Sequence, residues 1–119
     1  MPEFATELLL RPVASELRFL PEGPYPYGDG KLSWVSIQHG LESTVGAINV
    51  FDFASKENRT FELPGRPGFA FPTKDPMVMV VGVERHIQLL DLSSGETQDI
   101  SAEVDADVTG TIINDGVAF

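Results

Sequence analysis

The chain of 119 residues contains no cysteine. This absence excludes disulfide bonds, thiolate chemistry and zinc sites with sulfur ligands. Basic residues are also scarce, since 8 Lys and Arg stand against 18 Asp and Glu and give a formal net charge of -10. Because phosphate binding needs a positive face, this balance argues against a nucleic-acid partner. Acidity of this size usually means a solvated surface, although carboxylates can also form sites for divalent cations.

Long hydrophobic runs are absent as well. No stretch approaches the roughly 20 apolar residues of a membrane span. The first residues, MPEFATELLLRP, have no basic n-region and too short an apolar run for a signal peptide. The sequence therefore predicts no membrane partner and a cytoplasmic location. Its length and its 42% hydrophobic content predict one ordinary domain over residues 1–119 that can bury a core.

A helical pattern of apolar residues is missing too. Nine prolines interrupt the chain, and the proline-free segments 27–63 and 77–119 carry no helical period. Both contain short apolar runs with Gly, Asp, Asn or Ser residues at their ends. This pattern is typical of strands and hairpins. Polar turns are expected at residues 55–58 and 93–96. We expect strands at residues 32–37, 47–53, 59–63, 68–71, 77–83, 86–92 and 97–100.

Two parts of the chain resemble each other. INVFDFASKENRTFEL (48–63) and IQLLDLSSGETQDIS (87–101) each contain an apolar strand, an aspartate, an apolar residue, a four-residue turn and a polar strand. Asp52 and Asp91 take the same place in the two copies, 39 residues apart. A repeat of about 40 residues made of short antiparallel strands fits the blade of a β-propeller. A two-sheet sandwich is the alternative. Trp34 is expected at a core position of a blade.

Several of these pieces occur in an order that resembles a known family. EGP (22–24), GKLSWVSI (30–37), INVFDFASKENRTFELPG (48–65), the second copy and INDG (113–116) follow one another as in the SMP-30/gluconolactonase family, also called regucalcin-like. Members of this family are six-bladed propellers that hydrolyse sugar lactones with a divalent cation. The resemblance implies an all-β, antiparallel fold, namely the first two to two-and-a-half blades of an incomplete six-bladed β-propeller.

The resemblance also implies roles for two residues. Glu22 matches a carboxylate that binds the metal and faces the central channel, and the cation would be Ca²⁺ or Zn²⁺. Such hard cations prefer oxygen ligands, and the prolines on either side of Glu22 restrict its backbone. Asn114 matches an asparagine on the substrate side of the channel mouth. Read without the resemblance, Glu22 is a turn acid and Asn114 belongs to an ordinary Asn-Asp-Gly turn.

The match departs from the family pattern in two ways. Ile112 stands where family enzymes often have an arginine that holds substrate oxygens, which points to another substrate preference or an altered pocket. The other metal ligands and the general base of the family are expected beyond residue 119. We therefore expect the N-terminal part of a metal-dependent sugar-lactone hydrolase that is inactive as a 119-residue fragment. The open propeller leaves sheet edges through which it can self-associate. The alternative is a non-catalytic binding module derived from a β-propeller, which would bind a partner through its exposed sheet edge as a stable monomer or a defined oligomer.

Overall fold

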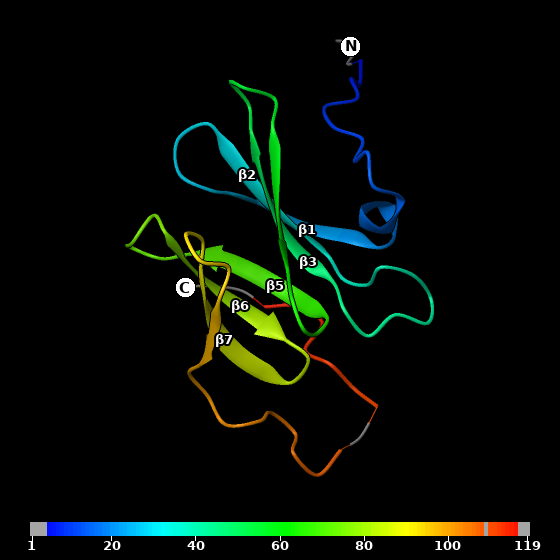
Figure 1. Cartoon of the computed structure of the whole chain (residues 1–119), viewed down its shortest axis with the longest axis vertical. Helices are drawn as coiled ribbons and strands as arrows, with labels where there is room; N and C mark the ends of the chain where they lie inside the picture. Colours follow the sequence, from blue (N-terminus) through cyan, green and yellow to red (C-terminus); the bar gives the residue numbers. More distant parts are fainter. Residues whose placement is uncertain (1–4, 109, 117–119) are drawn as a thin grey trace, which may run out of the picture.

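The computed structural model describes residues 5–108 and 110–116, which form two four-stranded antiparallel sheets (Figure 1). The strand order is β1-β2-β3-β4 in the first sheet and β5-β6-β7-β8 in the second. Each sheet is therefore a meander of four consecutive strands, and the described residues form no closed barrel. The elements are η1 (Ser15–Arg18), a 3₁₀ helix, and the strands β1 (Pro21–Pro26), β2 (Lys31–Ser36), β3 (Ala47–Asp52), β4 (Asn58–Glu62), β5 (Pro67–Pro72), β6 (Val78–Val83), β7 (His86–Asp91) and β8 (Thr97–Asp99).

The seven predicted strands are confirmed to within one residue at each end, but β1 was missed. Pro21, Pro24 and Pro26 lie in β1, and proline has no N–H to donate to a sheet. The strand tolerates them because it is the edge of its sheet and its pairing with β2 shifts between Glu22 and Tyr25. The 3₁₀ helix η1 was not predicted either.

The structure confirms the internal repeat down to its turns. Asp52 accepts a hydrogen bond from the backbone N–H of Ala54 at 2.8 Å, and Asp91 accepts one from the N–H of Ser93 at 2.8 Å. The residue four positions after each aspartate donates its N–H to the aspartate carbonyl, at 2.8 Å in the first copy and 2.7 Å in the second. Thus the two copies bend the chain by the same side-chain and backbone contacts.

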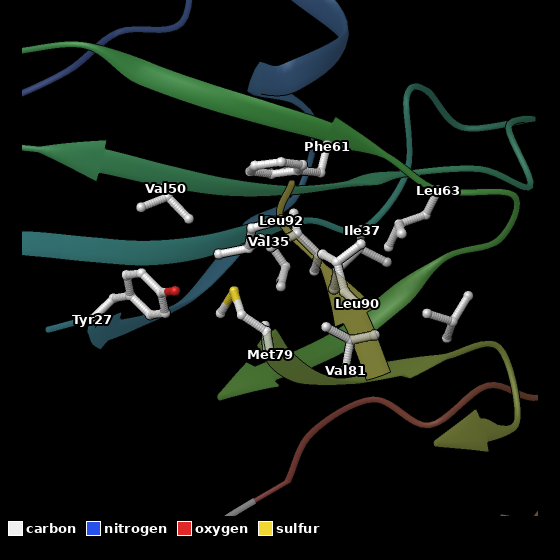
Figure 2. Close-up of a cluster of buried hydrophobic side chains, with 13 residues drawn as sticks. Tyr27, Val35, Ile37, Val50, Phe61, Leu63, Met79, Val81, Leu90 and Leu92 are labelled. Atoms are coloured by element: carbon white, nitrogen blue, oxygen red, sulfur yellow. The ribbon is translucent and has the colours of Figure 1, made fainter. Parts of the chain in front are cut away.

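A hydrophobic core fills the space between the two sheets (Figure 2). In the first sheet, the core residues are alternate residues of β2 and β3. In the second sheet, they are alternate residues of β6 and β7, at the repeat positions that face away from this core in the first sheet. Strand β5 lies against β1 and β2, so the edge strands that begin the two sheets are neighbours. The buried members of this core are Tyr27, Val35, Ile37, Ile48, Val50, Phe61, Leu63, Ala70, Met79, Val81, Val83, Leu90 and Leu92.

The other face of the first sheet holds Trp34, which is buried as expected and packs with Leu17 and Ala47. The indole N–H of Trp34 donates to Asn58 at 3.0 Å, and the amide of Asn58 donates to buried Asn49 at 3.0 Å. These polar groups satisfy one another on the face of the first sheet on which Leu10, Ala14 and Leu17 pack. The network therefore fixes Trp34 at one position on the sheet.

Within the described ranges, the search for membrane-spanning segments found no helix with the length and hydrophobicity to cross a bilayer.

Candidate functional site

Glu22 lies on the edge strand β1, opposite Val35 of β2, and its side chain is exposed. The residue lines a hollow of about 510 Å³. The walls of this hollow come from residues 7–12, from the end of η1 and from Trp34, and they are mostly apolar. The structure therefore places Glu22 beside an apolar hollow at the edge of the first sheet.

Asn114 is exposed and lies in the segment 110–116, which runs along β5 (Figure 1). The carbonyl of Ile113 contacts Gly68 so closely that a Cβ at position 68 would overlap it. Gly116 leaves room for the ring of Phe69 in the same way. Strand β5 therefore lies between β1 and the segment that carries Asn114.

An aromatic row connects these three pieces of chain. The ring of Tyr25 on β1 meets that of Phe71 on β5 edge to face, with centroids 5.0 Å apart, and Phe71 stacks on Phe69 at 5.3 Å. Phe69 in turn lies against Gly82 and Gly116, where a Cβ would strike its ring. These aromatic contacts fix the spatial order of β1, β5 and residues 110–116.

The repeat places Glu22 of β1 level with Phe69 of β5, close to the point where the segment 110–116 contacts β5. Glu22 pairs with Val35 in the first sheet and Phe69 pairs with Gly82 in the second, and these pairs occupy the same place in the repeat. Asn114 follows Ile113, whose carbonyl contacts Gly68, the β5 residue immediately before Phe69. Glu22 and Asn114 therefore lie at the same end of the row formed by β1, β5 and the segment 110–116, near the start of β5.

The two residues do not line the same hollow. The hollow beside Glu22 is lined by none of residues 112–116. A second hollow of about 490 Å³ lies over the other sheet, and Ile113, Asp115 and Gly116 are among its walls. The described residues thus place Glu22 and Asn114 at one end of the molecule without joining them in one pocket.

A complete cation site does not form among the residues that the structure describes. They contain no group of three or more His, Cys, Asp or Glu side chains that could hold a metal ion. Calcium takes six to eight oxygen ligands and zinc about four ligands, so Glu22 alone does not fit either ion. Ile112, at the position of the expected arginine, packs against the hydrophobic core between the sheets. Its side chain is therefore part of the core rather than a polar contact for substrate.

Sequence reasoning missed the pair that positions the segment 110–116. Glu84, in the turn between β6 and β7, accepts two hydrogen bonds from the guanidinium of Arg66 and one from its backbone N–H, all at 2.7 Å. The carbonyl of Glu84 accepts the N–H of Ile113 at 2.6 Å. Glu84 has a φ of 52°, a conformation that favours glycine and that no sequence pattern assigns to a glutamate. This turn joins the linker between the sheets to the segment that carries Asn114.

The ion pair makes part of the stability depend on pH. Hydrogen bonding to Arg66 holds the pKa of Glu84 below its ordinary value, against the opposing effect of burial. Because the folded-state pKa is depressed, this contribution is present above the ordinary carboxyl pKa and is lost as the pH falls through the folded value. The Glu84 side chain is 35% exposed, so solvent reduces the effect.

We expect Glu84→Gln to lower the free energy of unfolding by about 1 kcal/mol at pH 7. The difference from the parent protein should be smaller at pH 3, because the contribution of the carboxylate declines as the pH falls from the ordinary carboxyl pKa toward the depressed pKa of folded Glu84. Urea unfolding at the two pH values measures both differences, with the exposed Glu16→Gln as a control. An equal difference at pH 7 and pH 3 would contradict the assignment of the effect to the charge.

The family model for the SMP-30/Gluconolactonase/LRE-like region matches residues 20–118. This match begins just before β1, covers both sheets and includes Asn114. A search of curated proteins and a search of solved structures gave no significant match. The two meander sheets with their 39-residue repeat are blades of an incomplete β-propeller, as the family fold requires. The chain belongs to the SMP-30/gluconolactonase/LRE-like family.

Proposed function

We propose that the chain is the N-terminal part of a metal-dependent hydrolase of sugar lactones. Membership of the gluconolactonase family is the observation that carries this proposal. Glu22 and Asn114 lie near the same end of β5, on either side of it, and this supports the proposal because ligands of a metal and of its substrate must converge on one site. No catalytic step is assigned to the described residues, since they do not form a complete cation site.

On this proposal Glu22 contributes one anionic oxygen ligand to Ca²⁺ or Zn²⁺, and Asn114 contributes an amide. The amide can both donate to and accept from the hydroxyl and ester oxygens of a lactone. Further oxygen or nitrogen ligands and a carboxylate base have to come from residues other than those described. The chain by itself is therefore expected to hydrolyse a lactone no faster than buffer.

A second candidate function is that of a non-catalytic binding module. The separate hollows beside Glu22 and beside residues 113–116 favour it, since a single catalytic pocket would contain both. The two candidates differ in their dependence on metal. A binding module requires no cation, whereas the N-terminal part of a metal-dependent hydrolase requires Glu22 to bind one.

Terbium emission offers a direct measurement of that attraction, because the chain has one tryptophan and Trp34 lines the same hollow as Glu22. We expect weak binding of Tb³⁺ with emission excited through Trp34. Glu22→Gln should weaken the binding by about tenfold or more, since the loss of an outer partner alone costs 10- to 100-fold at metal sites. The matched control is Glu7→Gln, another exposed carboxylate of this hollow.

Three outcomes decide between the candidates. Loss with Glu22→Gln alone supports a ligand role for Glu22. Equal loss with Glu7→Gln indicates general attraction to an acidic chain, and unchanged binding in both variants favours the binding module. A parallel assay with glucono-1,5-lactone tests activity, and cation-dependent hydrolysis that Glu22→Gln abolishes would contradict the incomplete site.

A further inference from the structure

The chain contains two Asp-Gly pairs, Asp29-Gly30 and Asp115-Gly116. Such a pair can rearrange without an enzyme, because glycine has no side chain to shield its amide nitrogen from the carboxyl group of the aspartate before it. The nitrogen loses its hydrogen and forms a bond with Cγ of the aspartate, and a water molecule leaves, which closes a succinimide ring. The rate of this step depends on how closely the fold holds the nitrogen to the carboxyl group.

The fold brings these two groups together at Asp115. The backbone N–H of Gly116 donates to Oδ1 of Asp115 at 2.7 Å. Because Cγ is bonded to that oxygen, the nitrogen lies close to Cγ as well, as in a near-attack arrangement, in which reacting atoms are about 3–3.5 Å apart. In the described hairpin of residues 27–31, no hydrogen bond joins the N–H of Gly30 to the carboxylate of Asp29. The two pairs therefore share a sequence but differ in this contact.

Contacts on both sides of Asp115 hold its backbone in place. Before it, the carbonyl of Ile113 lies directly against Gly68 of β5. After it, Gly116 lies so close to Phe69 that a Cβ at position 116 would be 2.9 Å from the ring. The segment is thus seated on β5 at two points, one on each side of Asp115 (Figure 1). The short distance at Asp115 is therefore a property of the folded chain.

Opening of the ring changes the length of the backbone. Water adds to one of the two ring carbonyls: one addition restores aspartate, and the other gives isoaspartate, in which the Gly116 nitrogen stays bonded to Cγ. The chain then passes through Cβ and gains one carbon atom, while the α-carboxylate becomes the side group and keeps the charge. The water released at closure is taken up again at opening, so the net change is an isomerisation that needs no other reactant.

We propose that Asp115 is a site of spontaneous modification, at which isoaspartate forms and displaces Asn114 from its place beside β5. Ile113 and Gly116 both contact β5, and a backbone that is one carbon longer between them cannot keep both contacts. Asn114 lies between these two contacts and moves when either is lost. The modification gives this part of the candidate site a limited lifetime, whether or not Asn114 binds a lactone.

Prolonged incubation of the folded chain, followed by peptide mapping with tandem mass spectrometry, tests the proposal. Trypsin places the two Asp-Gly pairs in different fragments, residues 19–31 and 86–119. We expect isoaspartate to accumulate about tenfold faster at Asp115 than at Asp29, since a misplacement of about 1 Å can cost about 100-fold in rate. Incubation in ¹⁸O-labelled water should label the products and identify the succinimide route. Asp115→Glu is the matched control, because it keeps the charge but requires a larger ring that closes far more slowly.

Incubation in urea separates the effect of the fold from that of the local sequence. In the unfolded chain the two pairs should react at similar rates. In the aged folded protein, NMR amide resonances of residues 110–116 should shift, whereas those of residues 27–31 should not. Equal rates in the folded protein, a faster reaction at Asp115 that persists in urea, or isoaspartate at Asp115 with unshifted resonances at residues 110–116 would overturn the proposal.

Discussion

Replacing Leu90 with alanine is expected to lower the free energy of unfolding by about 3 kcal/mol. Leu90 is fully buried, pairs with Met79 across the second sheet and faces the first sheet in the shared core. Removing its branched end leaves a cavity between two sheets whose backbones are held apart by their other core side chains (Figure 2). The lost transfer energy and the cavity both contribute to the cost.

Urea unfolding measures this cost with two probes. Fluorescence of Trp34 reports on the first sheet, and far-UV circular dichroism reports on both. If the core joins the sheets into one cooperative unit, Leu90→Ala shifts the Trp34 transition although Trp34 lies in the other sheet. Leu90→Met should cost less than about 1.5 kcal/mol, and Leu41→Ala on the surface should cost almost nothing. A Trp34 transition that stays in place would show that the sheets unfold separately.

Gly68→Ala is expected to cost about 3 kcal/mol and to displace Asn114. A Cβ at position 68 would overlap the carbonyl oxygen of Ile113 and lie 3.0 Å from the carbonyl carbon of Asn114. Backbone atoms cannot rotate out of the way as a flexible side chain can. Overpacking of this kind typically costs 1–3 kcal/mol, and the overlap here lies at the upper end.

Gly40→Ala is the matched control, because a Cβ at position 40 meets no atom within 4 Å. Amide spectra by NMR should show shifted resonances for residues 110–116 in Gly68→Ala and unchanged ones in Gly40→Ala. Unfolding experiments on both variants give the stability difference. If Gly68→Ala folds with parent stability and unshifted resonances, then residues 113 and 114 do not lie against β5.

Most of the fold could be predicted because its strands follow simple rules. Apolar runs mark β2, β3, β5, β6 and β7, and the polar strands β4 and β8 follow the turns that Asp52 and Asp91 begin. Strand β1 could not be predicted in this way, since its prolines are typical of turns. Strand β1 forms because it pairs with β2 (Lys31–Ser36), whose sequence has the apolar pattern of a strand. Tertiary contact there overrides the local preference.

The candidate site could be predicted only in part. The motifs around Glu22 and Asn114 predicted two site residues, and the structure places both near the start of β5 without joining them in one hollow. No sequence pattern indicates that Gly68 admits the carbonyl of Ile113, or that Arg66 and Glu84 hold the turn beside it. These contacts join residues far apart in the chain. They become visible only when the two sheets are packed together.

The prolines of β1 and β5 have a consequence for what the edge beside the candidate site can bind. Pro21, Pro24 and Pro26 in β1, and Pro67 and Pro72 in β5, remove backbone donors from the first strand of each sheet. An extended peptide recognises a sheet edge through a regular ladder of backbone hydrogen bonds, and these edges cannot complete one. Addition of an extended strand is therefore expected at the opposite edges, β4 and β8, rather than at β1 and β5.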